Sequence, residues 1–232
     1  ATARFLARHL YRFFVADEPH VSSWHVTPPC DPEAIQVLVD AYHESSGDIR
    51  SILRVLFNSD FFKNALFARV KCPAELIVGT VRMVGNYNGF MPGFNNLALE
   101  CGWQGQELLN PPSVEGWHTG SEWIDPGVLM RRVNFAARIL GDTSIPGVRA
   151  IIQRVLKQGL VQGSLSAQSV VAACLDALGP LEVSEETHAE LMGHAERDGE
   201  LDWSTNEELR ATVAKISKIL TLVAASREYQ FA

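Results

Sequence analysis

Six residues with chemically active or aromatic side chains lie within eleven positions of the chain. They are Glu115, Trp117, His118, Glu122, Trp123 and Asp125. Two carboxylates about 5–10 Å apart act as acid and base, or as nucleophile, in glycoside hydrolysis, and tryptophan faces pack on sugar rings. The stretch therefore predicts a carbohydrate-active or other hydrolase. Its candidate catalytic residues are Glu115, His118 and Asp125, and its tryptophans would form the binding platform.

A structural interpretation of the same stretch stays open beside the catalytic one. Asp125 stands directly before Pro126, a pair typical of a helix start, because Asp caps free amides and Pro suits the first helical position. Large tryptophan rings must also be buried somewhere in a helical protein. On this interpretation, residues 104–125 form a long structured loop rich in Trp, Pro and Gly that serves as scaffolding.

A second aromatic cluster lies in an Asn- and Gly-rich stretch at residues 86–95. It contains Tyr87, Phe90, Met91 and Phe94. Exposed aromatic side chains would form a recognition patch for a partner, whereas buried ones would hold the loop in place. Tyr87, Phe90 and Phe94 therefore join Trp117 and Trp123 as candidate binding residues.

The remaining motifs argue against several classes of enzyme and against a bound cofactor. Cys30, Cys72, Cys101 and Cys174 form no CxxC pair, and His188 and His194 are six positions apart, which is unlike the four-residue spacing of a zinc-binding helix. No Gly-x-Ser-x-Gly elbow and no phosphate-binding loop followed by Lys and Ser/Thr occurs. We expect no metal and no cofactor, and neither serine-hydrolase nor nucleotide chemistry is supported.

Charge is concentrated in one segment of the chain. The formal net charge is -7, and residues 182–202 hold eight acidic residues against a single arginine. The rest is nearly neutral, so nucleic acid is not expected as a partner. Arg4, Arg8 and Arg12 recur every four positions. We interpret them as a solvated helix face, with binding to anionic surfaces as the alternative. No apolar run is long enough to span a bilayer.

Hydrophobic periodicity and capping residues predict helices throughout, with no strand pattern of useful length. The expected helices cover residues 2–15, 32–46, 49–58, 60–67, 73–84, 96–103, 126–141, 147–158, 166–178, 185–197 and 205–225. In the first helix, Phe5, Leu6, Leu10, Phe13 and Phe14 are expected to face the core. Ser204 and Glu207 are expected to form a capping box. The predicted fold is an all-α, multi-helix globular bundle.

Several motifs together resemble a known bacterial family. They are TARFLARHLYRFF at 2–14, SGDIR at 46–50, KCPAEL at 71–76, NPPSVEGW at 110–117 leading to WID at 123–125, RVNFA at 132–136 and SREYQF at 226–231. These stretches are similar to the C-terminal half of the family called domain of unknown function 1800 (DUF1800). The resemblance covers most of residues 1–140 and the last few residues.

The resemblance carries implications of its own. It implies a helical fold and a longer parent chain with a further helical N-terminal region. Export signals in the family imply an extracytoplasmic setting, periplasmic or at the cell surface, with the cytoplasm as the alternative. Genes beside family members encode proteins similar to sulfatases and phosphatases, which implies a protein partner but no reaction. Cys72 stands where many relatives have Ser, and His118 where they often have Pro, so the resemblance does not support a catalytic His118.

The expectations converge on two functions. The first is a helical interaction or scaffold module of an exported bacterial protein, with a helical core region at 1–141 and a C-terminal helical lobe at 142–232; the alternative is that the two form one domain. Its partner would be another protein or the N-terminal half of the parent chain. The alternative is the hydrolase with a Glu/Asp/Trp site in residues 110–125.

Overall fold

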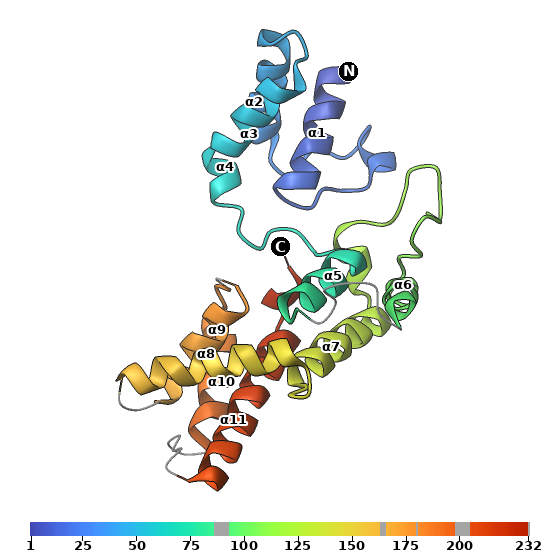
Figure 1. The fold of residues 1–232 in the computed structure, drawn as a ribbon. Coiled ribbons are helices and arrows are strands. Elements are labelled where there is room, and N and C mark those ends of the chain that lie inside the picture. Colours follow the sequence, from blue (N-terminus) through green and yellow to red (C-terminus); the bar gives the residue numbers. More distant parts are fainter. Residues whose placement is uncertain (86–92, 163–165, 180, 198–204, 232) are drawn as a thin grey trace. The chain divides into compact units, whose positions relative to one another are not determined.

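The structure is a computed structural model that describes residues 1–85, 93–162, 166–179, 181–197 and 205–231. Within these ranges the chain forms helices and two isolated β-bridges, Val70 with Phe231 and Ser113 with Gly116, but no strand. The prediction of an all-α fold is therefore confirmed (Figure 1). Two of the candidate binding residues, Tyr87 and Phe90, lie outside the described residues.

The helices divide between two compact units that interleave along the sequence. The first unit comprises residues 1–71, 111–123 and 231–232, and the second comprises residues 72–110 and 124–230. Residues 141 and 142, where the sequence analysis placed a boundary, both belong to the second unit. Each unit has its own hydrophobic cluster and is described by itself.

The first unit contains four α-helices and one 3₁₀ turn among its described residues. They are α1 (Thr2–Phe14), η1 (Val21–Ser23), α2 (Pro32–Glu44), α3 (Ile49–Asn58) and α4 (Asp60–Lys63). The Asp31 carboxylate accepts the Ala34 N–H at the start of α2, and Asp48 accepts the Ser51 N–H at the start of α3. These are the caps that the sequence predicts. The short α4 is a correction, because a helix through Phe67 was expected.

The buried face of α1 differs from the prediction. Phe5 and Phe13 were expected in the core, but they are 54% and 67% exposed. Small residues, Ala3 and Ala7, are buried instead, and α1 packs against α2 on this side. The physical reason is that alanines let two helix backbones approach closely, so the phenylalanines on the flanks remain at the surface.

Arg8 is a further correction to the expected solvated arginine face. Its guanidinium is buried, and its Nε lies 2.6 Å from Glu18 Oε2 in a buried ion pair. The terminal nitrogens donate to the carbonyl oxygens of Thr27 and Pro28, both at 3.0 Å. The second oxygen of Glu18 accepts the Cys30 N–H at 2.8 Å. One arginine thus fixes the segment between α1 and α2 onto α1, because the buried pair is hydrogen-bonded to the backbone of Thr27, Pro28 and Cys30 in that segment.

The second unit contains the larger cluster of buried apolar residues. Its helices are α5 (Pro73–Met83), α6 (Phe94–Trp103), α7 (Pro126–Gly141), α8 (Pro146–Gln162), α9 (Ala167–Ala177), α10 (Glu185–Arg197) and α11 (Asn206–Ala225), with the 3₁₀ turn η3 (Glu228–Gln230) after α11. The turn η2 (Gly120–Ile124) spans a boundary between the units. In the core, α11 packs against α7, and α5 packs against α7 as well.

Two close contacts fix the second unit. Gly147 lies so near the Val84 carbonyl oxygen that a Cβ atom there would overlap it, which explains why a glycine follows Pro146 in α8. The Tyr229 and Thr80 hydroxyls lie 2.9 Å apart and link η3 to α5. The capping box of α11 pairs Thr205 with Glu208, one residue later than expected.

Candidate functional site

The predicted catalytic stretch is split between the two units. Residues 111–123 belong to the first unit, whereas Asp125 belongs to the second. Gly120, at φ +62, lies directly over Asp17, and a Cβ atom there would come within 3.2 Å of the Asp17 carboxyl carbon. The Asp17 carboxylate in turn accepts the Val70 N–H at 2.9 Å. The close contact between Gly120 and Asp17 therefore holds residues 111–123 against the segment after α1.

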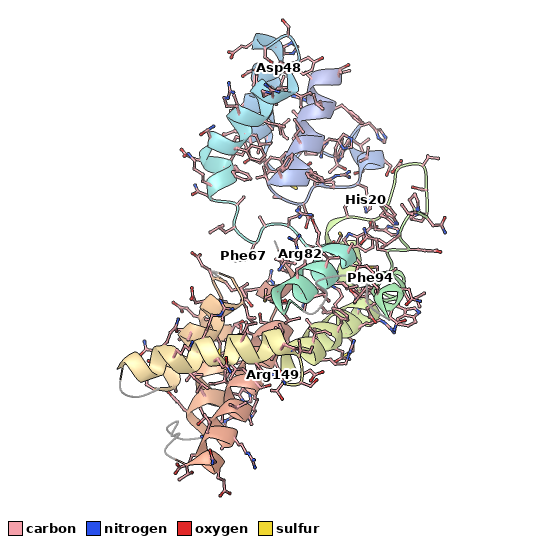
Figure 2. All side chains as sticks on the ribbon, in the orientation of Figure 1. His20, Asp48, Phe67, Arg82, Phe94 and Arg149 are labelled. Carbon is pink, nitrogen blue, oxygen red and sulfur yellow. The ribbon has the colours of Figure 1, made fainter. Side chains whose placement is uncertain are left out.

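Glu122 links two histidines within the first unit. Its Oε1 lies 2.8 Å from His20 Nε2, and its Oε2 lies 3.0 Å from His118 Nδ1. Figure 2 shows His20 on the segment that follows α1. All three side chains are between about a third and a half exposed, so each ion pair contributes at most about 1 kcal/mol. Among the described residues, no group of three or more His, Cys, Asp or Glu is arranged to hold a metal ion.

The two tryptophans of the stretch have different environments. Trp123 is buried at 3% exposure, and its ring meets the His118 imidazole edge-on at 6.0 Å between centroids. Trp117 is half-buried. A ring that is almost fully covered offers no face to a sugar, so Trp123 acts as an anchor of η2 rather than an open platform.

The two candidate catalytic carboxylates, Asp125 and Glu115, differ in their contacts and exposure. Asp125 Oδ1 accepts the backbone N–H groups of Gly127 at 2.9 Å and Val128 at 3.2 Å, which makes it the N-cap of α7. This is the structural role that the sequence allowed for it. Glu115 is exposed, and it lies within the turn closed by the bridge between Ser113 and Gly116. The structure thus gives Asp125 a capping role and leaves Glu115 open to solvent.

Phe94 is the one described member of the second aromatic cluster among the candidate binding residues. It begins α6 and is 45% exposed (Figure 2). Further along the same helix, Trp103 is also exposed, and the Arg131 guanidinium stacks over its ring at 4.5 Å. Arg131 Nε is held 3.0 Å from Glu100 Oε1. Phe94 and Trp103 are therefore surface residues of α6, and Arg131 covers one face of the Trp103 ring.

A surface that sequence reasoning missed lies on the first unit, and we call it the aromatic face. It consists of two exposed rings, Phe13 and Phe57, and two half-buried rings that also pack against the core of the unit, Phe14 and Phe62. Their rings meet edge-on in succession, with centroid distances of 4.7 Å between Phe13 and Phe14, and 5.1 Å for each of the next two pairs. Three helices, α1, α3 and α4, contribute to it. The periodic pattern of α1 predicted a core position for both of its phenylalanines in this face; Phe14 does pack against the core, whereas Phe13 is exposed.

Burial shifts the pKa of two ionisable side chains of α1, His9 and Tyr11. Burial, and secondarily Arg12, lowers the pKa of His9, whose ring lies 4.7 Å from that of Trp24. Burial raises the pKa of Tyr11 to about 12, with smaller contributions from Asp31 and Glu18. His9 is therefore mainly uncharged at neutral pH, and Tyr11 keeps its proton.

These features define an all-α protein with two compact helical units among its described residues and an aromatic surface on the first. Across those residues, no helix combines the length and apolarity that crossing a membrane requires. A family model described as "Protein of unknown function (DUF1800)" matches residues 1–231, and the chain belongs to that family. No curated protein and no solved structure matches it.

Proposed function

We propose that the chain is a non-enzymatic helical interaction module that binds another protein through the aromatic face. The observation that supports this most is the exposure of Phe13, which is 67% accessible although it belongs to a continuous row of phenylalanine rings. Large exposed apolar patches on folded proteins are typical of protein interfaces, where aromatic residues are enriched. The Phe13 ring contacts the Phe14 ring, which in turn contacts Phe57, so Phe13 is held by a packed neighbour before a partner binds.

The setting that we propose for this partnership is extracytoplasmic. Its support is the family resemblance, in which export signals are frequent. Cell fractionation tests it directly: the protein should be recovered with periplasmic or surface proteins, and recovery with cytoplasmic markers alone would contradict it.

The partnership is tested by isolating the chain with its partner from native extracts. Phe13→Gln places a polar side chain with good helix propensity at the most exposed ring, and partner recovery should fall at least tenfold. Val26→Gln is the matched control, because Val26 is 73% exposed in the same unit but lies outside the aromatic face. The proposal would be contradicted if both variants reduced partner recovery equally, or if the wild-type chain were isolated from native extracts without a partner.

A hydrolase remains the second candidate, and one observation supports it. The hydrogen bond between His118 Nδ1 and Glu122 fixes one ring nitrogen and leaves the other available for proton transfer. Glu115, exposed on the same segment, would be the second reacting group. A panel of chromogenic glycosides and esters tests this candidate. Glu115→Gln should abolish turnover at an unchanged melting temperature, whereas Glu33→Gln, an exposed carboxylate of α2, should not. Full turnover by Glu115→Gln would exclude the assignment.

A further inference from the structure

An open hollow of about 930 Å³ lies in the first unit, apart from the aromatic face. Side chains from α1, from the segment around η1 and from α2 line it, among them Arg4, Phe5, Trp24, Val39 and His43. Small-molecule sites in proteins typically enclose about 300–1,000 Å³ and are mostly apolar with a few polar groups. The size and lining of this hollow fall in that class.

The aromatic wall of the hollow is held in place before any ligand arrives. The Trp24 indole N–H donates to the Pro19 carbonyl oxygen at 2.7 Å. Its ring meets Phe5 at 5.8 Å and His9 at 4.7 Å between centroids. The Arg8 guanidinium carbon lies 4.6 Å from the Trp24 ring centre. Since Arg8 is itself fixed by Glu18, the wall needs little reorganisation on binding, which limits the entropic cost.

The charge of the hollow has one sign. Its charged or ionisable lining side chains are those of Arg4, Arg8, His25 and His43, and no Asp or Glu is among the lining residues. The Arg8 charge is balanced by buried Glu18, which leaves the exposed Arg4 guanidinium and two imidazoles at the rim. The hollow therefore favours an anion, although the chain as a whole carries a net charge of -7.

We propose that this hollow binds a small organic anion that joins an apolar ring or chain to a carboxylate. The apolar body lies against Trp24, Phe5 and Val39. The carboxylate is bound by Arg4, with imidazole N–H donors of His25 and His43 nearby. This site is independent of the proposed protein interface, because it uses none of the four residues of the aromatic face.

The test uses naphthylacetate as the probe and its neutral analogue naphthylacetamide as the reference. Binding is followed in the full chain by two-dimensional ¹H–¹⁵N NMR of the indole N–H groups, and Trp24→Phe identifies the Trp24 signal. We expect saturable shifts of that signal with a Kd on the order of 1 mM, the affinity typical of a ligand of this size. The amide should bind at least fivefold more weakly, since it lacks the charge.

Variants of one residue then locate the anion. Arg4→Glu should weaken naphthylacetate binding at least fivefold, and Arg4→Lys should retain it within about twofold, because Coulomb attraction needs the charge rather than the guanidinium shape. Arg54→Glu makes the same change at an exposed position of α3 outside the hollow and should have no effect.

Three results would overturn the proposal. The first is the lack of a saturable shift of the Trp24 signal at up to about 10 mM probe, tenfold above the expected Kd. The second is equal affinity for the acid and the amide, a comparison that needs no charge variant. The third is equal weakening by Arg4→Glu and Arg54→Glu, which would mean that the effect comes from net charge alone.

Discussion

Replacing Arg8 with alanine should destabilise the first unit far more than any exposed substitution in α1. The change removes the partner of Glu18, whose side chain is fully buried, and leaves a carboxylate without a counter-charge in the interior. It also removes the hydrogen bonds to the Thr27 and Pro28 carbonyl oxygens. Breaking a buried ion pair by removing one partner costs about 3–5 kcal/mol.

The expected loss is measurable as a shift of the melting temperature. For a cooperative unit of fewer than 100 residues, 1 kcal/mol corresponds to about 4–8 °C, so Arg8→Ala should lower the transition of the first unit by about 12 °C or more. Differential scanning calorimetry of the full chain measures this shift. Arg4→Ala is the control on the same helix, and its exposed side chain should contribute less than about 0.5 kcal/mol.

A double variant separates the lost pairing from the lost packing. Arg8→Met with Glu18→Leu replaces both charges by apolar groups, so no unpaired charge stays buried, and it should be less destabilised than Arg8→Ala. If Arg8→Ala shifts the melting temperature by less than about 5 °C, the ion pair does not hold the segment after α1, and our explanation of the first unit is wrong.

Three further predictions concern the second unit. Gly147→Ala should lower the free energy of unfolding, measured in urea, by about 2–3 kcal/mol, because the new Cβ atom would overlap the Val84 carbonyl oxygen. Gly79→Ala, which has open space around it, should raise the free energy of unfolding by up to about 1 kcal/mol. Equal effects of the two variants would contradict the close contact at Gly147. Asp125→Ala should lower the free energy of unfolding by about 1 kcal/mol, and Asp125→Asn should lower it less, because Asn can still cap α7. The reverse order would contradict the capping role of Asp125. Burial raises the pKa of Cys174 to about 12 from an ordinary 9.0, so the folded state favours the protonated thiol. The resulting contribution to the stability of the folded state is fully present below pH 9 and is lost as the pH rises toward 12. At pH 8 a thiol reagent should therefore modify Cys174 only on unfolding, and rapid reaction in the native state would show that it is accessible.

Local signals in the sequence were sufficient to predict most of the helices. Asp31, Asp48 and Asp125 cap the helices that follow them, because capping depends on residues within one turn. The predicted ranges for α7, α10 and α11 agree with the structure to within one residue. The capping box of α11 was misplaced by one residue, since Ser204 and Thr205 are equally good caps locally.

Tertiary contacts could not be predicted in the same way. The pattern of α1 offered two faces, and the choice depended on Ala3 and Ala7 packing against α2, which no spacing within α1 reveals. Arg8 was assigned to a solvated face because its partner, Glu18, is ten positions away and outside the helix. Likewise, the pairing of Glu122 with His20 depends on the fold of the first unit.

The most direct test of the proposed interface is site-specific photocrosslinking in native cells. A benzophenone side chain at Phe13 should form a covalent adduct with one partner protein of defined mass, while the same group at Val26, equally exposed and outside the aromatic face, should not. A crosslink from Val26 alone, or no adduct from Phe13 in cells that express the chain at its native level, would contradict the claim that the aromatic face binds a protein.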